Sequence, residues 1–219
     1  MIRTALLVAG KDLRIERRSR VLLWQVVPFG VIALVLCGLA LGPVGVSRAT
    51  AGPGLFYLVT LLVTLLMITR SHAIERTAGT RSSVATLGLD PAGVFLGKAL
   101  ALAIELWITG LVLLAGSVLL LHTSLHGTVK ALPSIIVTLG ALAAVGTIYG
   151  ALTAGDSGAG TLLPVLALPA FAPLLIAGER SFRAALNGGG VWEWWLIVTV
   201  ALVAYLSAGI LLYGVLEES

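Results

Sequence analysis

Long apolar stretches alternate with short polar connections along the whole chain. A helix needs roughly 20 mostly apolar residues to cross a hydrocarbon core of about 30 Å. Six stretches have the length and character of membrane-crossing helices, and they cover approximately residues 21–41, 55–71, 97–121, 132–154, 161–177 and 194–215. The pattern therefore predicts an all-α polytopic membrane protein whose residues 1–219 form a single membrane domain.

The composition supports this class. Of 219 residues, 58% are hydrophobic and only 11% are charged, so a single soluble core could not bury the apolar surface. The connections are too short for an ATPase module, and none resembles a Walker-type phosphate loop. Cys37 is the single cysteine, which excludes an internal disulfide framework. We read the first apolar stretch as retained, because it is too long for the core of a signal peptide.

The positions of Lys and Arg predict the orientation. Ten of the 14 basic residues lie before the first span or around the connection between the second and third spans, and four lie on the other face. Short loops that are rich in Lys and Arg stay in the cytoplasm. We therefore expect both termini and the connection Ala73–Pro91 to be cytoplasmic.

The first twenty residues mix apolar and charged side chains. Leu6, Leu7 and Leu13 alternate with Lys11, Asp12 and a run of arginines. This mixture is too charged to cross the membrane and apolar enough to lie on it. We expect an N-terminal interfacial helix with its cations against anionic lipid headgroups, the alternative being a solvated tail.

Glu105 is the carboxylate that falls well inside a predicted span. Lys98 precedes it by seven residues, which puts both side chains near the same helical face. Acidic groups at membrane depth cost about 2.5–3.5 kcal/mol on insertion scales, so they usually face a partner or a wet cavity. Glu105 is thus a candidate pathway residue, and snorkelling to the cytoplasmic surface is the alternative.

The fifth span contains Pro164, Pro169 and Pro173. An interior proline removes a backbone donor and bends a helix. Three in one span favour a broken or re-entrant segment, which is tolerated at depth when it is packed in protein or lines a cavity. We expect this segment to be a moving or substrate-facing element.

His122 and His126 have the four-residue spacing of two ligands on one helix face, and are weak candidates for binding a metal or a haem iron. The spacing loses this meaning if the helix ends at Leu121, and ordinary loop residues are the favoured reading. The chain has no recognisable hydrolase or metalloprotease motif, so we expect neither an enzyme nor a metal site.

The connection after the second span is a polar hairpin with a short apolar face. Such a hairpin, lying across the membrane surface, can receive a push from a soluble partner, as in the permease half of an ABC transporter. The candidate contacts with an ATPase subunit are Glu75, Arg76, Gly79, Thr80, Leu87, Asp90 and Pro91.

These residues carry a family resemblance. The series Glu75, Gly79, Thr80, Leu87 and Pro91, followed by FLGKALA at 95–101, resembles the motif after the second span of type 2 ABC export permeases. Within that group the chain resembles the CcmB family, the haem exporter B proteins of cytochrome c maturation. The segments that carry this second resemblance are KDLRIERRSR at 11–20, GPGLFYLVTLLVTLL at 52–66 and YGALTAGDSGAGTLLPVLALPAFAPLLIAG at 149–178.

The resemblance implies a permease subunit of the bacterial inner membrane that binds no cofactor and no nucleic acid itself. Its partners would be an ATPase subunit carrying ATP, a haem-handling membrane protein carrying haem, a second copy of the chain and membrane lipid. ATP hydrolysis would be coupled to release of haem on its chaperone. The alternatives are an exporter of another amphipathic substrate, such as a lipid or drug, and a scaffold for haem proteins.

The hairpin also departs from the family pattern. Thr77, Ala78 and Arg81 stand where acidic residues are common in such permeases. A less acidic hairpin implies a less basic groove on the ATPase subunit.

Overall fold

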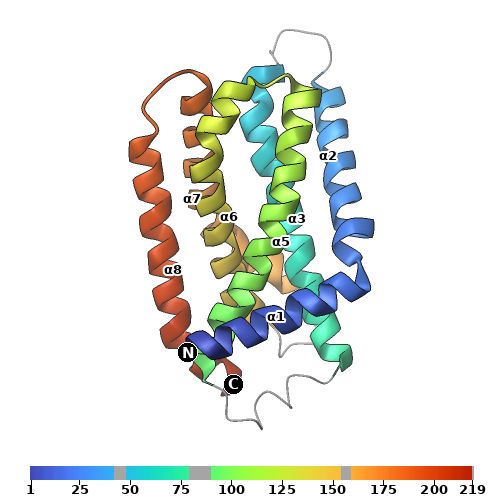
Figure 1. Cartoon of the computed structure of the whole chain (residues 1–219), viewed down its shortest axis with the longest axis vertical. Helices are drawn as coiled ribbons and strands as arrows, with labels where there is room; N and C mark the ends of the chain where they lie inside the picture. Colours follow the sequence, from blue (N-terminus) through green and yellow to red (C-terminus); the bar gives the residue numbers. More distant parts are fainter. Residues whose placement is uncertain (42–47, 79–89, 154–158, 219) are drawn as a thin grey trace.

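The computed structural model describes residues 1–41, 48–78, 90–153 and 159–218, and within these ranges the chain is helical with short turns (Figure 1). The elements in chain order are α1 (Ile2–Ser19), the π-helical turn η1 (Leu22–Val26), α2 (Val27–Ala40), α3 (Arg48–Ala78), α5 (Pro91–Leu121), α6 (Leu125–Thr153), α7 (Ala159–Leu186) and α8 (Trp192–Glu218). The expected all-α fold is confirmed.

Six helical segments of the described chain are long and apolar enough to cross a membrane, as the hydropathy pattern predicts. They are Leu22–Ala40, Thr50–Arg70, Pro91–Leu121, Leu125–Leu152, Pro164–Leu186 and Trp192–Gly214. Several helices extend past the predicted bounds: α5 begins at Pro91 instead of residue 97, and α6 begins at Leu125 instead of residue 132. Hydropathy marks the part of a helix that suits hydrocarbon, whereas backbone hydrogen bonding continues through its more polar ends.

Helix α6 is the centre of the bundle. It packs against α3, α5, α7 and α8. Its residues Ala141–Val145 are fully buried, and four of these five side chains are Ala or Val. In a membrane, helices associate through close contact between small side chains, because lipid tails provide no hydrophobic driving force. The small residues of α6 therefore allow neighbours to approach it from several sides.

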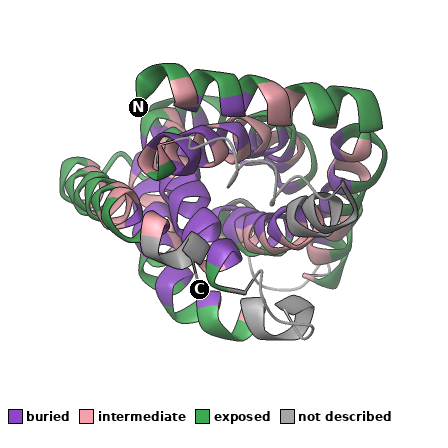
Figure 2. Ribbon diagram, turned by 90° about the horizontal axis from the view of Figure 1, so that it is seen from below, coloured by how far each residue is buried: buried purple, intermediate pink, exposed green. Residues whose placement is uncertain are grey.

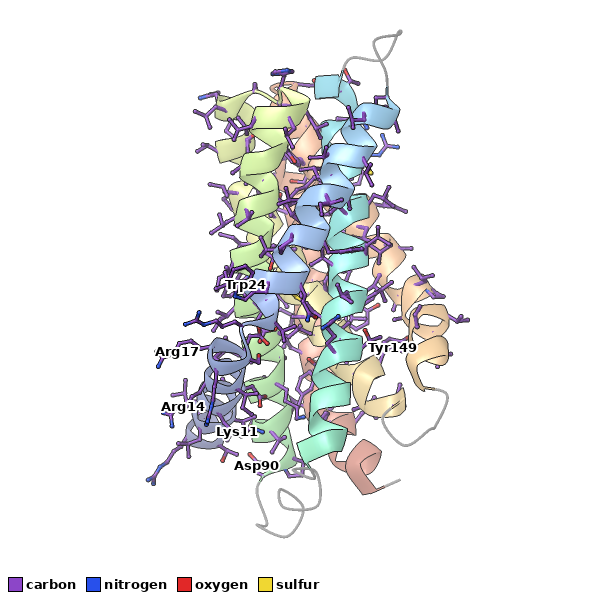
Figure 3. All side chains as sticks on the ribbon, turned by 90° about the vertical axis from the view of Figure 1, so that its right-hand side faces the viewer. Lys11, Arg14, Arg17, Trp24, Asp90 and Tyr149 are labelled. Atoms are coloured by element: carbon purple, nitrogen blue, oxygen red, sulfur yellow. The ribbon has the colours of Figure 1, made fainter. Side chains whose placement is uncertain are left out.

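Helix α1 lies across one end of the bundle, near both chain termini (Figure 1). Its buried residues Ala5, Val8 and Ala9 face the other helices, and the outward side is exposed (Figure 2). The side chains of Arg14 and Arg17 point away from the bundle (Figure 3). This geometry agrees with the expected interfacial helix, because a helix across the spans places its cations at a membrane surface.

The ends of α3 and α5 that border residues 79–89 lie at the same end of the bundle as α1 and the C-terminus (Figure 1). The short turn between α5 and α6 lies at the opposite end. The N-terminal helix and the C-terminus share one end because an even number of spans returns the chain to the side where it started.

The three prolines do not break the fifth span, so of the two possibilities that the sequence leaves open the structure favours a full span. Helix α7 is continuous from Ala159 to Leu186, with Pro164, Pro169 and Pro173 inside it, and its span Pro164–Leu186 is long enough to cross. Prolines are tolerated in membrane helices where neighbours and local backbone adjustments satisfy the freed carbonyl groups. In Figure 1, α7 passes obliquely behind α6.

Candidate coupling site

The predicted coupling hairpin falls largely on residues that the structure does not describe. Gly79, Thr80 and Leu87 lie outside the described residues. Glu75 and Arg76 belong to the last turn of α3, where only the backbone is described. The flanking helices place both ends of the hairpin at the end of the molecule where α1 lies (Figure 1), and of the two it is α5 that packs against α1.

Asp90 and Pro91 begin α5. Asp90 is the N-cap residue in an extended conformation, with φ −61° and ψ 114°, and Pro91 follows within the first turn. Proline suits this position because its fixed φ matches the helix and its missing N–H would have no helical acceptor. A carboxylate there also interacts favourably with the helix dipole. The Asp90 side chain lies 3.2 Å from the amino group of Met1.

Helix α1 docks directly onto the first two turns of α5. A Cβ atom built on Gly97 would lie 2.6 Å from the carbonyl oxygen of Ala5 and 2.7 Å from Cβ of Val8. A Cβ atom on Gly93 would lie 2.8 Å from Cβ of Thr4. The two backbones therefore touch where only glycine fits. Because this contact follows directly on the hairpin, a displacement of the start of α5 would carry α1 with it.

A sharp elbow joins α1 to the first span. Arg20 adopts the left-handed conformation, with φ 55° and ψ 23°. The carboxylate of Glu16 accepts a hydrogen bond from the backbone N–H of Leu22, and the Ser19 hydroxyl donates to the carbonyl of Glu16 at 3.1 Å. A carboxylate at the start of a helix satisfies an otherwise unpaired N–H and interacts favourably with the helix dipole. The Glu16 side chain thus links α1 to η1 across this elbow.

Glu105 faces this same region. It is half-buried on α5, and its carboxylate interacts electrostatically with the carboxylates of Glu16 and Asp12 on α1. Asp12 is paired with Lys11 at 3.0 Å. The structure thus brings Glu105 to the α1–α5 junction, close to the elbow. A role of Glu105 in a pathway stays a prediction, as does the snorkelling alternative.

The three prolines of α7 do not line the interior. Pro169 and Pro173 are exposed on the outer face and Pro164 is half-buried. The side of α7 that packs on the bundle carries Ala170, Phe171 and other buried residues. In Figure 3 the first turns of α7 lie apart from the other helices. These positions place the prolines on the surface of the bundle.

His122 and His126 do not share a helix face. α5 ends at Leu121, and His122 caps it in the left-handed conformation, with φ 55°, while His126 lies in the first turn of α6. Both are exposed. In the described part of the chain, no three His, Cys, Asp or Glu residues converge as a metal site would require. The helical spacing that made them ligand candidates is therefore absent, because the two residues lie on either side of the α5–α6 turn.

Sequence reasoning missed the residues that join α1 to its neighbours. Gly93 and Gly97 form a GVFLG segment, and the spacing G-x-x-x-G is a known signal for close approach of membrane helices. Here the segment receives an interfacial helix instead of another span. Glu16 and Arg20 carry no comparable signal, because capping and a left-handed turn depend on where α1 stops.

Almost the whole chain is similar to proteins of one known family. Residues 3–212 match the family model described as CcmB protein. The chain belongs to the CcmB family. The protein from Rhodobacter capsulatus named "Heme exporter protein B" is 33% identical to this chain over 183 residues, which cover 82% of each chain. The proteins of the same name from Paracoccus denitrificans and Pseudomonas aeruginosa are 32% and 28% identical, with 81% and 83% of this chain and 82% of each relative covered.

Proposed function

We propose that this chain is the membrane-embedded permease subunit of an ABC transporter complex that exports haem for cytochrome c maturation. The observation that carries the proposal is the match to the CcmB family over residues 3–212, together with the six spans. The name of the relatives, heme exporter protein B, supplies the substrate class. ATP would be hydrolysed on a separate subunit, and haem would be held by a membrane partner and passed to a chaperone.

The segment between α3 and α5 would receive the ATPase subunit. The charged contacts would come from Glu75, Arg76 and Asp90. The turn would be formed by Gly79 and Thr80, and the apolar contact would come from Leu87. The basic residues near this end of the bundle support its placement in the cytoplasm, with both termini.

Movement of this segment would pass to α1 through α5. The backbone contact at Gly93 and Gly97 leaves little room for α1 and α5 to slide independently. The Glu16 elbow would then carry the movement into α2. Such rigid-body transmission suits a subunit without its own nucleotide site, since packed helices move as discrete units.

The positions of the histidines support haem ligation by a partner. His122 and His126 are exposed and lie on different helices, so they do not form a preorganised axial pair. In the proposed complex this chain would move or release a haem-bearing partner without ligating the iron.

The first test is purification of the tagged chain from its native membrane, with identification of the attached proteins and measurement of haem absorbance. Recovery of an ATPase and a haem-bearing membrane protein is the expected result. An ATPase without haem would move the function to export of another amphipathic substrate. A haem protein without an ATPase would favour a scaffold.

The ATPase contact is tested by Glu75→Ala combined with Gly79→Pro in the same purification. We expect loss of the ATPase with the haem partner retained. Glu193→Ala is the matched control, because Glu193 is an exposed carboxylate in the first turn of α8. Unchanged ATPase recovery in the double variant would show that the hairpin is not the docking site.

A further inference from the structure

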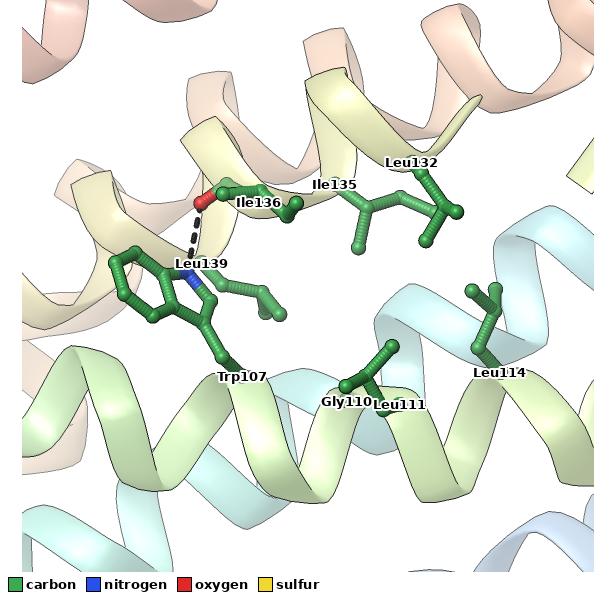
Figure 4. A pocket seen from close by; sticks show the side chains of 8 residues that line it. All are labelled: Trp107, Gly110, Leu111, Leu114, Leu132, Ile135, Ile136 and Leu139. Carbon is green, nitrogen blue, oxygen red and sulfur yellow. Dashed lines mark hydrogen bonds between the residues drawn. The ribbon is translucent and has the colours of Figure 1, made fainter. Parts of the chain in front are cut away.

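A hollow of about 250 Å³ opens on the side of the bundle between α5 and α6 (Figure 4). Its α5 wall includes Trp107, Leu111 and Leu114, and its α6 wall includes Leu132, Ile136 and Leu139. Leu111 and Ile136 are 58% and 46% exposed. The hollow, which we call the α5–α6 groove, therefore faces the surroundings of the bundle.

The groove offers no hydrogen bond to an occupant. The polar side-chain atom among its lining residues is Nε1 of Trp107, which donates to the carbonyl oxygen of Ile136 at 2.9 Å (Figure 4). The remaining lining side chains are aliphatic or glycine. A ligand with carboxylates, such as haem, would leave those groups unpaired, which is costly away from water. The groove suits hydrocarbon alone.

The depth of the groove is set by its position along the helices. Trp107 lies 16 residues after the start of α5 and 14 before its end, and Leu139 lies 14 residues from either end of α6. Both residues therefore stand at the middle of their helices. From there the groove runs toward the α5–α6 turn as far as Leu114 and Leu132, about 10 Å at 1.5 Å per residue.

We propose that the α5–α6 groove binds the terminal part of a phospholipid acyl chain from the leaflet on the side of the α5–α6 turn. In that leaflet an acyl chain ends near the middle of the membrane, and the Trp107 ring stands at that depth. The volume exceeds the apolar cavity of about 150 Å³ that holds benzene in an engineered protein. The tail end would contact the indole ring, and Leu111 and Ile136 would flank the chain.

A transmembrane helix of a partner fits the groove less well. Such a helix is about 10–12 Å across and crosses the whole membrane. The groove stops halfway, where Trp107 bridges α5 and α6 through its hydrogen bond to Ile136. An acyl chain of one leaflet matches both its length and its closed end.

The test uses the full chain in phospholipid vesicles that contain a lipid with a photoreactive diazirine at the end of one acyl chain. After illumination, labelled positions are mapped by mass spectrometry. We expect labelling to concentrate around Leu111 and Ile136. In Leu111→Phe and Ile136→Phe the added ring would occupy the groove and reduce this labelling by at least about fivefold, the lower end of the usual penalty for overfilling an apolar site.

Leu119→Phe is the matched control, because Leu119 is a 73% exposed leucine on the same helix that does not line the groove. The Leu119→Phe variant should be labelled by the lipid probe around Leu111 and Ile136 to the same extent as the unchanged chain. If a phenylalanine variant does not fold, Leu111→Ala gives a second readout, since it widens the groove and should retain labelling.

Two results would overturn the proposal. One is labelling spread over the exposed faces of all spans in proportion to exposure, with no response to the groove-filling variants. The other is protection of Leu111 and Ile136 from the lipid probe in the complex purified from membranes, with cross-links from these positions to another polypeptide. The second result would assign the groove to a partner helix.

Discussion

The carboxylate of Glu16 accepts a hydrogen bond from the backbone N–H of Leu22, so a residue of α1 caps the start of the helical segment that follows it. Between these two residues, Arg20 adopts the left-handed conformation and changes the direction of the chain. The chain thus passes from a helix across the bundle to a helix along it within a few residues. This link is specific enough to be tested by substitution.

Replacing Glu16 by Ala should loosen the elbow. Loss of a capping acceptor typically costs about 1 kcal/mol. Glu16→Gln keeps an acceptor oxygen and should cost less. Unfolding of the purified chain in mixed detergent, followed by circular dichroism, measures both. Glu193→Ala removes an exposed carboxylate from the first turn of α8 and serves as control. Equal stability of all four proteins would exclude a structural role for the Glu16 contact.

Replacing Gly97 by Ala should separate α1 from α5. The new methyl group would lie 2.6 Å from the Ala5 carbonyl oxygen, so one helix must shift. Overpacking of this kind costs about 1–3 kcal/mol. If α1 carries the movement of the coupling segment, the yield of mature cytochrome c in cells should fall several-fold while the chain still reaches the membrane.

Gly10→Ala is the control for Gly97→Ala, because a Cβ atom on Gly10 has nothing within 4 Å. It should be neutral or slightly stabilising, since alanine is favoured over glycine in a helix by about 0.5–1 kcal/mol. A Gly97→Ala protein with normal cytochrome c yield would show that the tight α1–α5 contact is not needed for coupling.

Replacing Pro169 by Ala should affect activity more than assembly. Pro169 is exposed within a continuous helix, so alanine restores a backbone donor without changing a buried contact. Thermal stability should be unchanged or higher, and cytochrome c maturation should fall if α7 must bend. Pro133→Ala provides the comparison, because Pro133 is also an exposed proline inside a helix. Parallel loss of assembly and activity at Pro169 would indicate a purely structural role.

Replacing Trp107 by Phe should weaken the α5–α6 contact modestly. The substitution removes the hydrogen bond to Ile136, and bonds between membrane helices contribute about 0.6 kcal/mol on average. Detergent unfolding monitored by circular dichroism measures the loss. Trp24→Phe is the control, since Trp24 is 73% exposed. A loss at Trp107 no larger than at Trp24 would show that the bridge does not stabilise the bundle.

Much of the fold follows from the sequence because the membrane imposes it. Six apolar stretches predict six spans, and the charged segment 2–20 predicts the interfacial helix. The bounds differ because a helix does not end where hydropathy falls. The sequence leaves open whether the fifth span is broken, because each proline removes a backbone donor, and neighbouring helices and local backbone adjustments can satisfy the freed carbonyl groups.

The site was less predictable. The role of Asp90–Pro91 as the start of α5 agrees with local propensity. The α1–α5 contact depends on the direction of the chain after α1. The left-handed conformation of Arg20 sets this direction, and no sequence motif predicts that conformation. The α5–α6 groove depends on the spacing of two helices at mid-membrane, which neither helix encodes alone. Glu105 shows the same limitation, since its neighbours Asp12 and Glu16 lie about 90 residues earlier in the chain.

The central position of α6 has a consequence for biosynthesis. Two of its neighbours, α3 and α5, are synthesised before it, and two, α7 and α8, are synthesised after it. When α6 first enters the bilayer, the faces meant for α7 and α8 touch lipid, and its small side chains give these faces little contact area. A ribosome-bound chain that stops after α6 should therefore be a better substrate for membrane proteases than one that has completed α8.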